Sequence, residues 1–218
     1  MAIRQVYFDL NGTLFDPSVM AEPLAGEIDG PELVEAILGE AVLLAMVETL
    51  SGSYRDFSDL LEAAAVRQLE LVGKGDRANK VIEAATKMRP FPDAAQAVAT
   101  LRSARIGAGV LTNSSTETAE SLVAQTELDL RPIVGTDQVQ AFKPDARVYA
   151  RGASAAGRGA DEIALLTAHG WDAIGAKRAG LVGVWISRKE RVPPRLKPVP
   201  DLEAYGLADA AKRIVESR

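Results

Sequence analysis

The chain contains 218 residues, of which 47% are apolar and 25% charged, and its formal net charge is −5. This size fits one large domain or a core with a small second module, and the composition is ordinary for a globular enzyme. The absence of cysteine excludes disulfides and thiolate metal sites, and the acidic balance argues against nucleic acid as a partner. No apolar run is long enough to span a membrane, and the first residues lack the apolar core of a signal peptide. We therefore expect a soluble, cytoplasmic protein.

The first strand is predicted to end in a carboxylate. The run Val6–Phe8 is short and rich in strand-forming residues, which indicates a buried strand. Asp9 comes directly after this run, and Asn11-Gly12, a pair that is typical of a turn, begins two residues later. Open α/β sheets bind ligands at the carboxyl ends of their strands, so Asp9 is a candidate functional residue. The alternative is a strand end with an Asx turn and no catalytic role.

The next part of the chain has helical periodicity only. Apolar residues recur at three- and four-residue spacing over 33–45, 57–72 and 76–88. These repeats predict three helices and no strand. We expect residues 17–89 to form an all-helical cap, inserted after the first strand.

From residue 90 onward, strands and helices are predicted to alternate. Strands are expected over 107–111, 133–134, 163–167 and 181–186, and helices over 93–104, 141–157, 172–179 and 207–215, with a further helix after Ser114. This alternation is typical of an α/β fold with a doubly wound parallel sheet. Residues 1–16 and 90–218 should form this core, and the proline-rich segment 192–200 should be a surface loop.

Four segments place chemically useful side chains where strands end or helices begin. They contain Asp9, Thr112 with Asn113, Lys143 and Asp172. The connectivity of such a sheet brings these edges to one crevice. Each residue alone has a purely structural explanation, such as a helix cap or a surface cation. Together they supply a nucleophile, hydrogen-bonding groups, a cation and a second carboxylate, which favours a catalytic site.

These motifs resemble those of the haloacid dehalogenase-like (HAD) superfamily. Val6–Asp16 is similar to its first motif, an apolar run followed by Asp-x-Asp/Tyr-Gly-Thr-Leu. Phe142–Tyr149 and Leu165–Ala176 are similar to the third and fourth motifs of its type II 2-haloacid dehalogenases, and Leu111–Ser114 stands where that branch has Leu-Ser-Asn-Gly. The resemblance covers nearly the whole chain. It implies a Rossmann-like core with a helical cap, and it is the only indication of a homodimer.

The resemblance also implies a mechanism. The first aspartate of the family is the nucleophile, so Asp9 would displace halide from a short 2-halocarboxylic acid and form an ester. Lys143 would keep Asp9 ionised, and Asp172 would orient or deprotonate the water that hydrolyses the ester. Residues expected to bind the substrate or support this network are Asn11, Thr112, Asn113, Tyr149, Thr167 and His169.

Two positions separate the chain from metal-dependent HAD phosphatases. Those enzymes have an acid–base aspartate where this chain has Asn11, and an amide cannot carry a proton near neutral pH. They also take a Mg²⁺ ligand from an aspartate where this chain has Ala168. We therefore expect no metal and no cofactor. His169 has no second ligand-type neighbour at metal spacing, which argues against a metal ligand. We interpret it as a hydrogen-bonding residue of the pocket, and the alternative is a solvated loop histidine.

One position also departs from the dehalogenases. They place an arginine in the first cap helix to receive the halide, and the corresponding residue is Leu38. No Lys or Arg occurs between Gln5 and Tyr54, so either Arg55 reaches the site or the natural leaving group is not a simple halide. Two alternatives stay open: a Mg-dependent phosphatase acting on a small phosphoester, and a non-catalytic protein that binds a small carboxylic acid.

Overall fold

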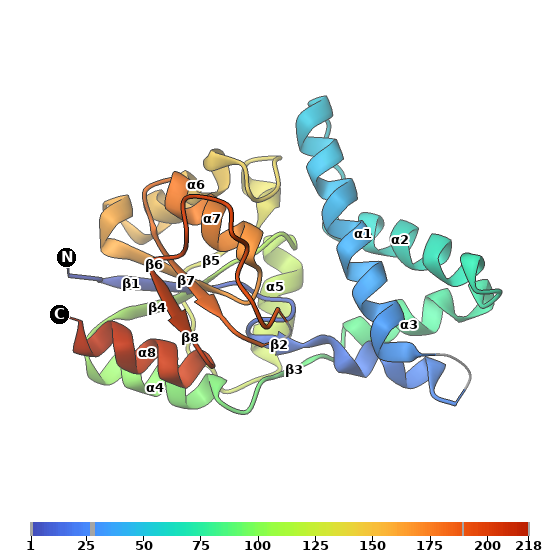
Figure 1. The fold of residues 1–218 in the computed structure, drawn as a ribbon, viewed down its shortest axis with the longest axis horizontal. Coiled ribbons are helices and arrows are strands. Elements are labelled where there is room, and N and C mark those ends of the chain that lie inside the picture. The colour runs from blue at the N-terminus through green and yellow to red at the C-terminus, as the bar shows by residue number, and fades with distance from the viewer. Residues whose placement is uncertain (1, 27–28, 189, 218) are drawn as a thin grey trace.

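A parallel sheet forms the centre of the computed structural model, which describes residues 2–26, 29–188 and 190–217 (Figure 1). The sheet is six-stranded, with the order β5-β4-β1-β6-β7-β8, and every neighbouring pair is parallel. Its strands are β1 (Gln5–Phe8), β4 (Gly107–Leu111), β5 (Ile133–Val134), β6 (Ile163–Thr167), β7 (Val182–Ile186) and β8 (Leu202–Ala204). The predicted α/β class with a doubly wound parallel sheet is confirmed.

The register of the central strands places their carboxyl ends at one edge. Phe8, the last residue of β1, pairs with Val110 of β4 on one side and with Leu166 of β6 on the other. The residues that follow β1, β4 and β6 therefore leave the sheet side by side. This juxtaposition is what the order of strands in a doubly wound sheet leads one to expect.

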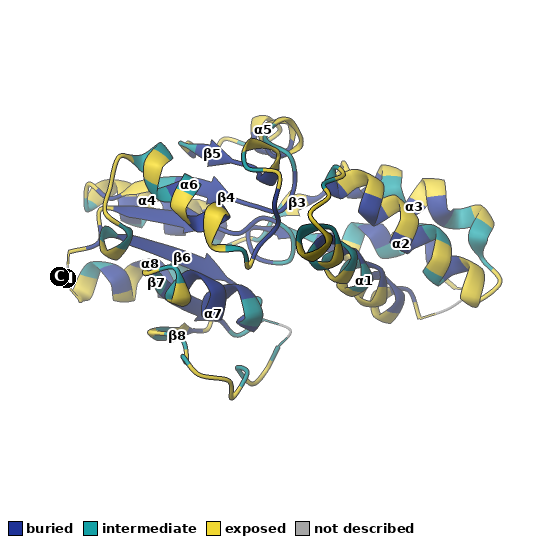
Figure 2. Cartoon of the chain, turned by 90° about the horizontal axis from the view of Figure 1, so that it is seen from above, coloured by how far each residue is buried: buried dark blue, intermediate teal, exposed yellow. Residues whose placement is uncertain are grey.

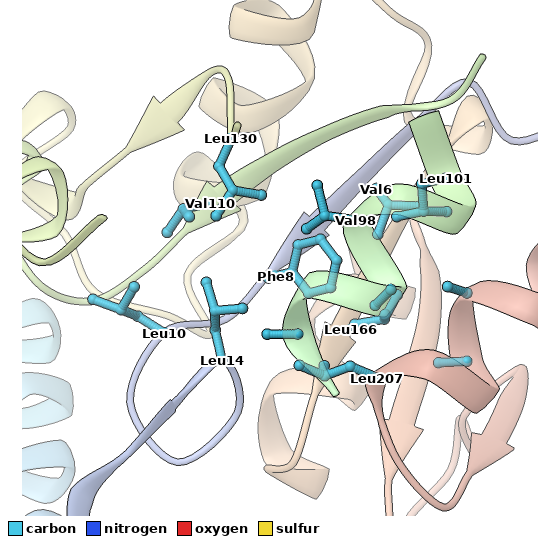
Figure 3. Close-up of a cluster of buried hydrophobic side chains, with 14 of the residues drawn as sticks. Val6, Phe8, Leu10, Leu14, Val98, Leu101, Val110, Leu130, Leu166 and Leu207 are labelled. Atoms are coloured by element: carbon cyan, nitrogen blue, oxygen red, sulfur yellow. The ribbon is translucent and has the colours of Figure 1, made fainter. Parts of the chain in front are cut away.

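Helices cover both faces of the sheet. One face carries α4 (Ala94–Ser103), α5 (Thr116–Ala124) and α8 (Leu207–Glu216), and the other carries α6 (Ala146–Ala156) and α7 (Gly170–Arg178). Alternate residues of β1 point to opposite faces, as the strand period of two requires. Val6 and Phe8 pack against α4 and α8 (Figure 3), whereas Tyr7 packs in the cluster on the side of α6 and α7.

Three α-helices form a separate group beside the carboxyl edge of the sheet (Figure 1). They are α1 (Gly30–Ser51), α2 (Phe57–Leu71) and α3 (Ala78–Ala85). Asp29 and Asp56 cap the first two through their carboxylates, and Gly52, whose φ of 75° is left-handed, is the C-cap of α1. Their buried faces point toward one another (Figure 2) and form one apolar cluster, which Phe142 joins from the core.

Four 3₁₀ segments complete the chain's helical structure as described, namely η1 (Pro17–Leu24), η2 (Gly75–Arg77), η3 (Thr136–Gln138) and η4 (Ala160–Glu162). No helix within the described residues combines the length and the apolarity needed to cross a membrane. The division into a cap over 17–89 and a core over 1–16 and 90–218 stays a prediction.

Several local predictions need correction. The short strands β2 (Phe15–Asp16) and β3 (Arg89–Pro90) pair antiparallel where the chain leaves and re-enters the core, and β8 was not expected either. Strands of two or three residues are too short to produce an alternating pattern. Helix α6 begins at Ala146 rather than near residue 141, because Asp145 is its N-cap. Helix α7 begins at Gly170, two residues before Asp172.

Candidate active site

Asp9 lies directly after β1 and is 7% exposed. Its backbone N–H donates to the carbonyl of Leu166 at 2.9 Å, which continues the β1–β6 ladder by one residue. The Thr13 hydroxyl donates to Asp9 Oδ2 at 2.8 Å and accepts from the Ala168 N–H at 2.9 Å. The turn that returns Thr13 to the carboxylate passes through Gly12, whose φ of 76° favours glycine. The carboxylate is therefore held by its own turn and by the loop after β6.

Lys143 joins the two carboxylates of the site. Its ammonium nitrogen lies 3.0 Å from Asp9 Oδ1 and 2.9 Å from Asp172 Oδ2, and its side chain is completely buried. Its backbone N–H donates to the Asn113 side-chain oxygen at 2.9 Å, which fixes the loop that carries it. Short, buried, charge-assisted hydrogen bonds of this kind are much stronger than exposed ion pairs.

Asp172 lies in the first turn of α7 and is completely buried. The Tyr149 hydroxyl of α6 donates to Asp172 Oδ1 at 2.8 Å, while Lys143 binds the other oxygen. Farther along α7 there is no room for a side chain at Gly175, because a Cβ there would come within 2.4 Å of the Tyr149 hydroxyl oxygen. The glycine is thus needed for α6 and α7 to approach closely enough to place Tyr149.

The two carboxyl groups have pKa values shifted in opposite directions. Burial by itself raises the pKa of Asp9, but the positive charge of Lys143, the His169 ring and the Thr13 hydroxyl outweigh it and hold this pKa below its ordinary value. Burial and repulsion from Asp9 raise the pKa of Asp172, and its partners do not fully compensate. An ionised carboxylate beside one that accepts a proton more readily is the pattern of a nucleophile paired with a base.

The polar side chains of the loop after β4 make hydrogen bonds to the protein backbone. The Thr112 hydroxyl accepts from the Ser114 N–H at 3.1 Å, and the Asn113 side chain is occupied by the Lys143 backbone. The Thr136 hydroxyl donates to the Asn113 carbonyl at 2.6 Å. These contacts shape the loop, and neither Thr112 nor Asn113 lines a cavity of the site, whereas Ser114 does.

Asn11, Thr167 and His169 lie around the nucleophile. His169 Nε2 is 2.9 Å from the Asn11 carbonyl oxygen and 3.6 Å from Asp9 Oδ2. The Thr167 hydroxyl accepts from the His169 N–H at 3.1 Å, and the imidazole stacks on Trp171 with ring centroids 5.7 Å apart. Among the described residues, the side-chain oxygen of Asn11 is buried without a hydrogen-bond partner.

Two cavities adjoin these residues. The first, of about 430 Å³, lies between α1 and the loop after β6, and we call it the α1 cavity. The second, of about 310 Å³, lies between α3 and α5, and we call it the α3 cavity. Asn11 and Phe57 line both. The α1 cavity is lined by Asn11, Gly12, Pro17, Glu35, Leu38, Gly39, Val42, Leu43, Met46, Phe57, Ala168, His169, Trp171 and Glu190.

The two candidate positions for receiving a leaving group are separated. Leu38 lines the α1 cavity together with Asn11 and His169. The Arg55 side chain is 71% exposed, lies 3.8 Å from Glu48, and lines neither cavity. Its position gives no support to the hypothesis that Arg55 reaches the site. Among the described residues that line the α1 cavity, His169 is the only one able to carry a positive charge.

The two carboxylates of the site are arranged around the ammonium group of Lys143. Lys143 already occupies the position between the two carboxylates at hydrogen-bonding distance from both. Within the described residues, no group of three or more His, Cys, Asp or Glu side chains is placed to hold a metal ion. The arrangement offers an ionised carboxylate, a second carboxylate that can take a proton, and an adjoining cavity.

Sequence reasoning missed several residues of this site. Thr13 was recognised only as part of the first motif, although its hydroxyl links Asp9 to the loop after β6. Ser114, Trp171 and Glu190 line the cavities without having been assigned a role. Thr13 could have been found, because a hydroxyl four residues after a strand-end carboxylate can return to it through the Asn-Gly turn.

Comparisons with known proteins agree with the family that the sequence motifs resemble. A family model described as haloacid dehalogenase-like hydrolase matches residues 3–180. The chain is 26% identical over 222 residues to an (S)-2-haloacid dehalogenase of Pseudomonas putida, covering 99% of this chain and 98% of that protein. It is 27% identical over 206 residues to haloacetate dehalogenase H-2 of Moraxella sp. (strain B), with 91% and 92% covered. A solved L-2-haloacid dehalogenase from Xanthobacter autotrophicus, with chloropropionic acid covalently bound, has a TM-score of 0.87 at 22% identity, covering 97% of this chain and 98% of that one, which shows the shared fold.

Proposed function

Because the chain belongs to the haloacid dehalogenase-like hydrolases, we propose that it hydrolyses the carbon–halogen bond of small 2-halocarboxylic acids through an ester on Asp9, without a metal. The observation that carries this proposal is the buried pairing of Asp9 with Lys143, at 3.0 Å, which favours an ionised nucleophile. The relatives named as 2-haloacid and haloacetate dehalogenases support the substrate class.

In the first step, an Asp9 carboxylate oxygen attacks C2 of the substrate. The new C–O bond forms as the C–halogen bond breaks, and the bonding electron pair leaves with the halide. A carboxylate is a weak nucleophile in water, so its 7% exposure favours the reaction by limiting solvation. Lys143 keeps the charge on Asp9 in spite of that burial, because an adjacent cation favours the ionised form.

In the second step, water attacks the carbonyl carbon of the Asp9 ester. Asp172 takes the proton of that water, which its raised pKa favours, and later releases it to solvent. The tetrahedral adduct collapses as the ester C–O bond breaks, and the proton left on the former water oxygen passes to the departing alkoxide, which gives the 2-hydroxy acid and the Asp9 carboxylate. Lys143 binds both carboxylates and can stay hydrogen-bonded to Asp172 while Asp9 is esterified.

The leaving group decides between this reaction and phosphate-ester hydrolysis. A halide needs no proton to depart, whereas an alkoxide does, and Asn11 cannot supply one. Residues 17–89 act in this proposal as a cap that excludes water from the reacting carbon. His169 is the group available to face the developing halide charge.

The proposal is tested by product release and by isotope labelling. Bromide and chloride release from (S)-2-halopropionates is measured beside phosphate release from small phosphoesters, each with EDTA and with Mg²⁺. Under single-turnover conditions in ¹⁸O-water, label should appear first in the Asp9 carboxylate, and Asp9→Asn should abolish turnover without unfolding the protein. Label that enters the product directly, or phosphate release that needs Mg²⁺, would overturn the proposal.

A further inference from the structure

The α1 cavity is larger than a short haloacid requires. It has a volume of about 430 Å³ and begins at Asn11, Ala168 and His169, of which His169 lies 3.6 Å from the nucleophile. That volume is about that of 14 water molecules at roughly 30 Å³ each, and it lies within the range of pockets that hold drug-sized ligands. A three-carbon haloacid would leave most of it filled by water.

The part of the α1 cavity farther from Asp9 has mostly apolar walls. Helix α1 contributes Leu38, Val42, Leu43 and Met46, and Trp171 contributes from the other side. An alkyl chain that replaces water against such a surface gains up to about fourfold in binding for each methylene that is buried. The lining therefore suits a hydrocarbon chain attached to the carbon that reacts.

Gly39 enlarges the cavity at a cost to the helix. It lies inside α1 (Gly30–Ser51), where glycine is less favourable than almost any other residue. A Cβ at this position would meet nothing within 4 Å, so no packing contact requires a glycine here. The missing side chain instead leaves space in the wall of the α1 cavity.

Two carboxylates also line the α1 cavity, and they limit which charged groups the alkyl chain of a substrate can have. Glu190 accepts hydrogen bonds from the Gly170 N–H at 2.9 Å and from Trp185 Nε1 at 3.2 Å, and this fixes it in the wall. Glu35 also lines the cavity. A second carboxylate on the substrate would be repelled by both, so the charges favour monocarboxylic acids.

We propose that the α1 cavity binds the alkyl chain of medium-length 2-halo monocarboxylic acids, with roughly four to eight carbon atoms. This inference rests on the proposed function for the reaction at C2, but not for the binding of the chain. It identifies α1 as the element that selects chain length. It also implies that the alkyl chain of the substrate does not occupy the α3 cavity, which lies on the other side of Asn11 and Phe57.

The variants fill one cavity at a time. Gly39→Leu places a side chain in the α1 cavity, and Gly39→Ala is its matched control, because it gives a similar gain in helix propensity with little added volume. Ser121→Leu fills the α3 cavity from an exposed position on α5. Thermal unfolding of all variants checks that each is folded.

Two readouts separate chain binding from chemistry. Calorimetry measures binding of the halogen-free acids acetate, butyrate, hexanoate and octanoate, and halide release measures kcat/KM for the 2-bromo acids of the same lengths. In wild type, Gly39→Ala and Ser121→Leu, affinity and kcat/KM should rise by up to about fourfold per methylene. In Gly39→Leu the rise beyond butyrate should be lost, at least tenfold for octanoate.

The outcomes distinguish the two proposals. Binding that strengthens with chain length in the absence of any halide release overturns the proposed function and supports the cavity assignment. Halide release from short acids with no gain from longer chains overturns the cavity assignment alone. Loss of the gain in Ser121→Leu rather than in Gly39→Leu also overturns it, because the chain would then lie in the α3 cavity.

Discussion

Replacing Lys143 by methionine would remove the cation that two buried carboxylates share. Lys143→Met keeps a similar length and apolar stem but leaves Asp9 and Asp172 without their common partner, in a site where Lys143 and Asp172 are completely buried. Removing one partner of a buried ion pair typically costs about 3–5 kcal/mol. At neutral pH we expect a loss in the lower part of that range.

The structure also sets an upper limit on this loss. One of the two carboxyl groups can take up a proton instead of staying charged and unpaired. For a group with an ordinary pKa of 3.8, that costs about 4 kcal/mol at pH 7, since each pH unit corresponds to about 1.4 kcal/mol. At pH 5 the same limit is about 1.6 kcal/mol. The destabilisation by Lys143→Met should therefore shrink as the pH is lowered, at up to about 1.4 kcal/mol per unit.

Urea unfolding at several pH values between 5 and 8 measures this dependence directly. Lys87→Met is the matched control, because Lys87 pairs with Glu83 on the surface, with its side chain 61% exposed, and an exposed pair contributes at most about 1 kcal/mol. Halide release by Lys143→Met should be lost at pH 7, since the buried Asp9 then lacks the adjacent cation that favours its ionised form. A destabilisation that is small and independent of pH would refute the reasoning.

Three further predictions concern the same site. Leu38→Arg should increase chloride release by up to about a hundredfold, because a cation in the α1 cavity stabilises charge that develops only in the transition state. The increase should be larger for chloride release than for bromide release. Arg55→Ala changes an exposed side chain and should alter the rate less than twofold. The pKa of Asp172 is raised above 3.8, so its ionisation costs stability as the pH rises through its folded-state pKa. The unfolding free energy of Asp172→Asn relative to wild type should therefore grow from pH 4 to pH 8, and a constant difference would contradict the shift. Turnover should survive exhaustive treatment with EDTA, and a Mg²⁺ requirement for halide release would count against the proposed role of Lys143.

The charged part of the site could be predicted because it depends on topology. Asp9, Lys143 and Asp172 each follow or precede an element that periodicity identifies, and a parallel sheet brings those ends together. The same reasoning could not tell which way a loop side chain points. Substrate binding by Thr112 and Asn113 stays a prediction. In the structure the Thr112 hydroxyl accepts from the Ser114 N–H and the Asn113 side-chain oxygen accepts from the Lys143 N–H.

The apolar part of the site was not predictable in the same way. The cavity walls come from one face of α1, and the phase of a long, largely apolar helix is poorly defined by its sequence. Leu38 was recognised by its expected alignment with an arginine, not as part of a wall with Val42 and Met46. Strands β2 and β3, which connect the helical group to the core, have two residues each and leave no readable pattern.

In the proposed reaction, chemistry and substrate selection depend on different parts of the chain. The oxygens of Asp9 and Asp172 already have protein partners from the core, so the ionisation of the nucleophile does not depend on α1. Asn11 stands where the two parts meet. Its side-chain oxygen is buried without a partner among the described residues, and unsatisfied buried polar atoms are rare in folded proteins. We therefore expect the Asn11 amide to contact the proposed substrate, and we expect changes in α1 to alter which acid is selected while the proposed ester on Asp9 still forms.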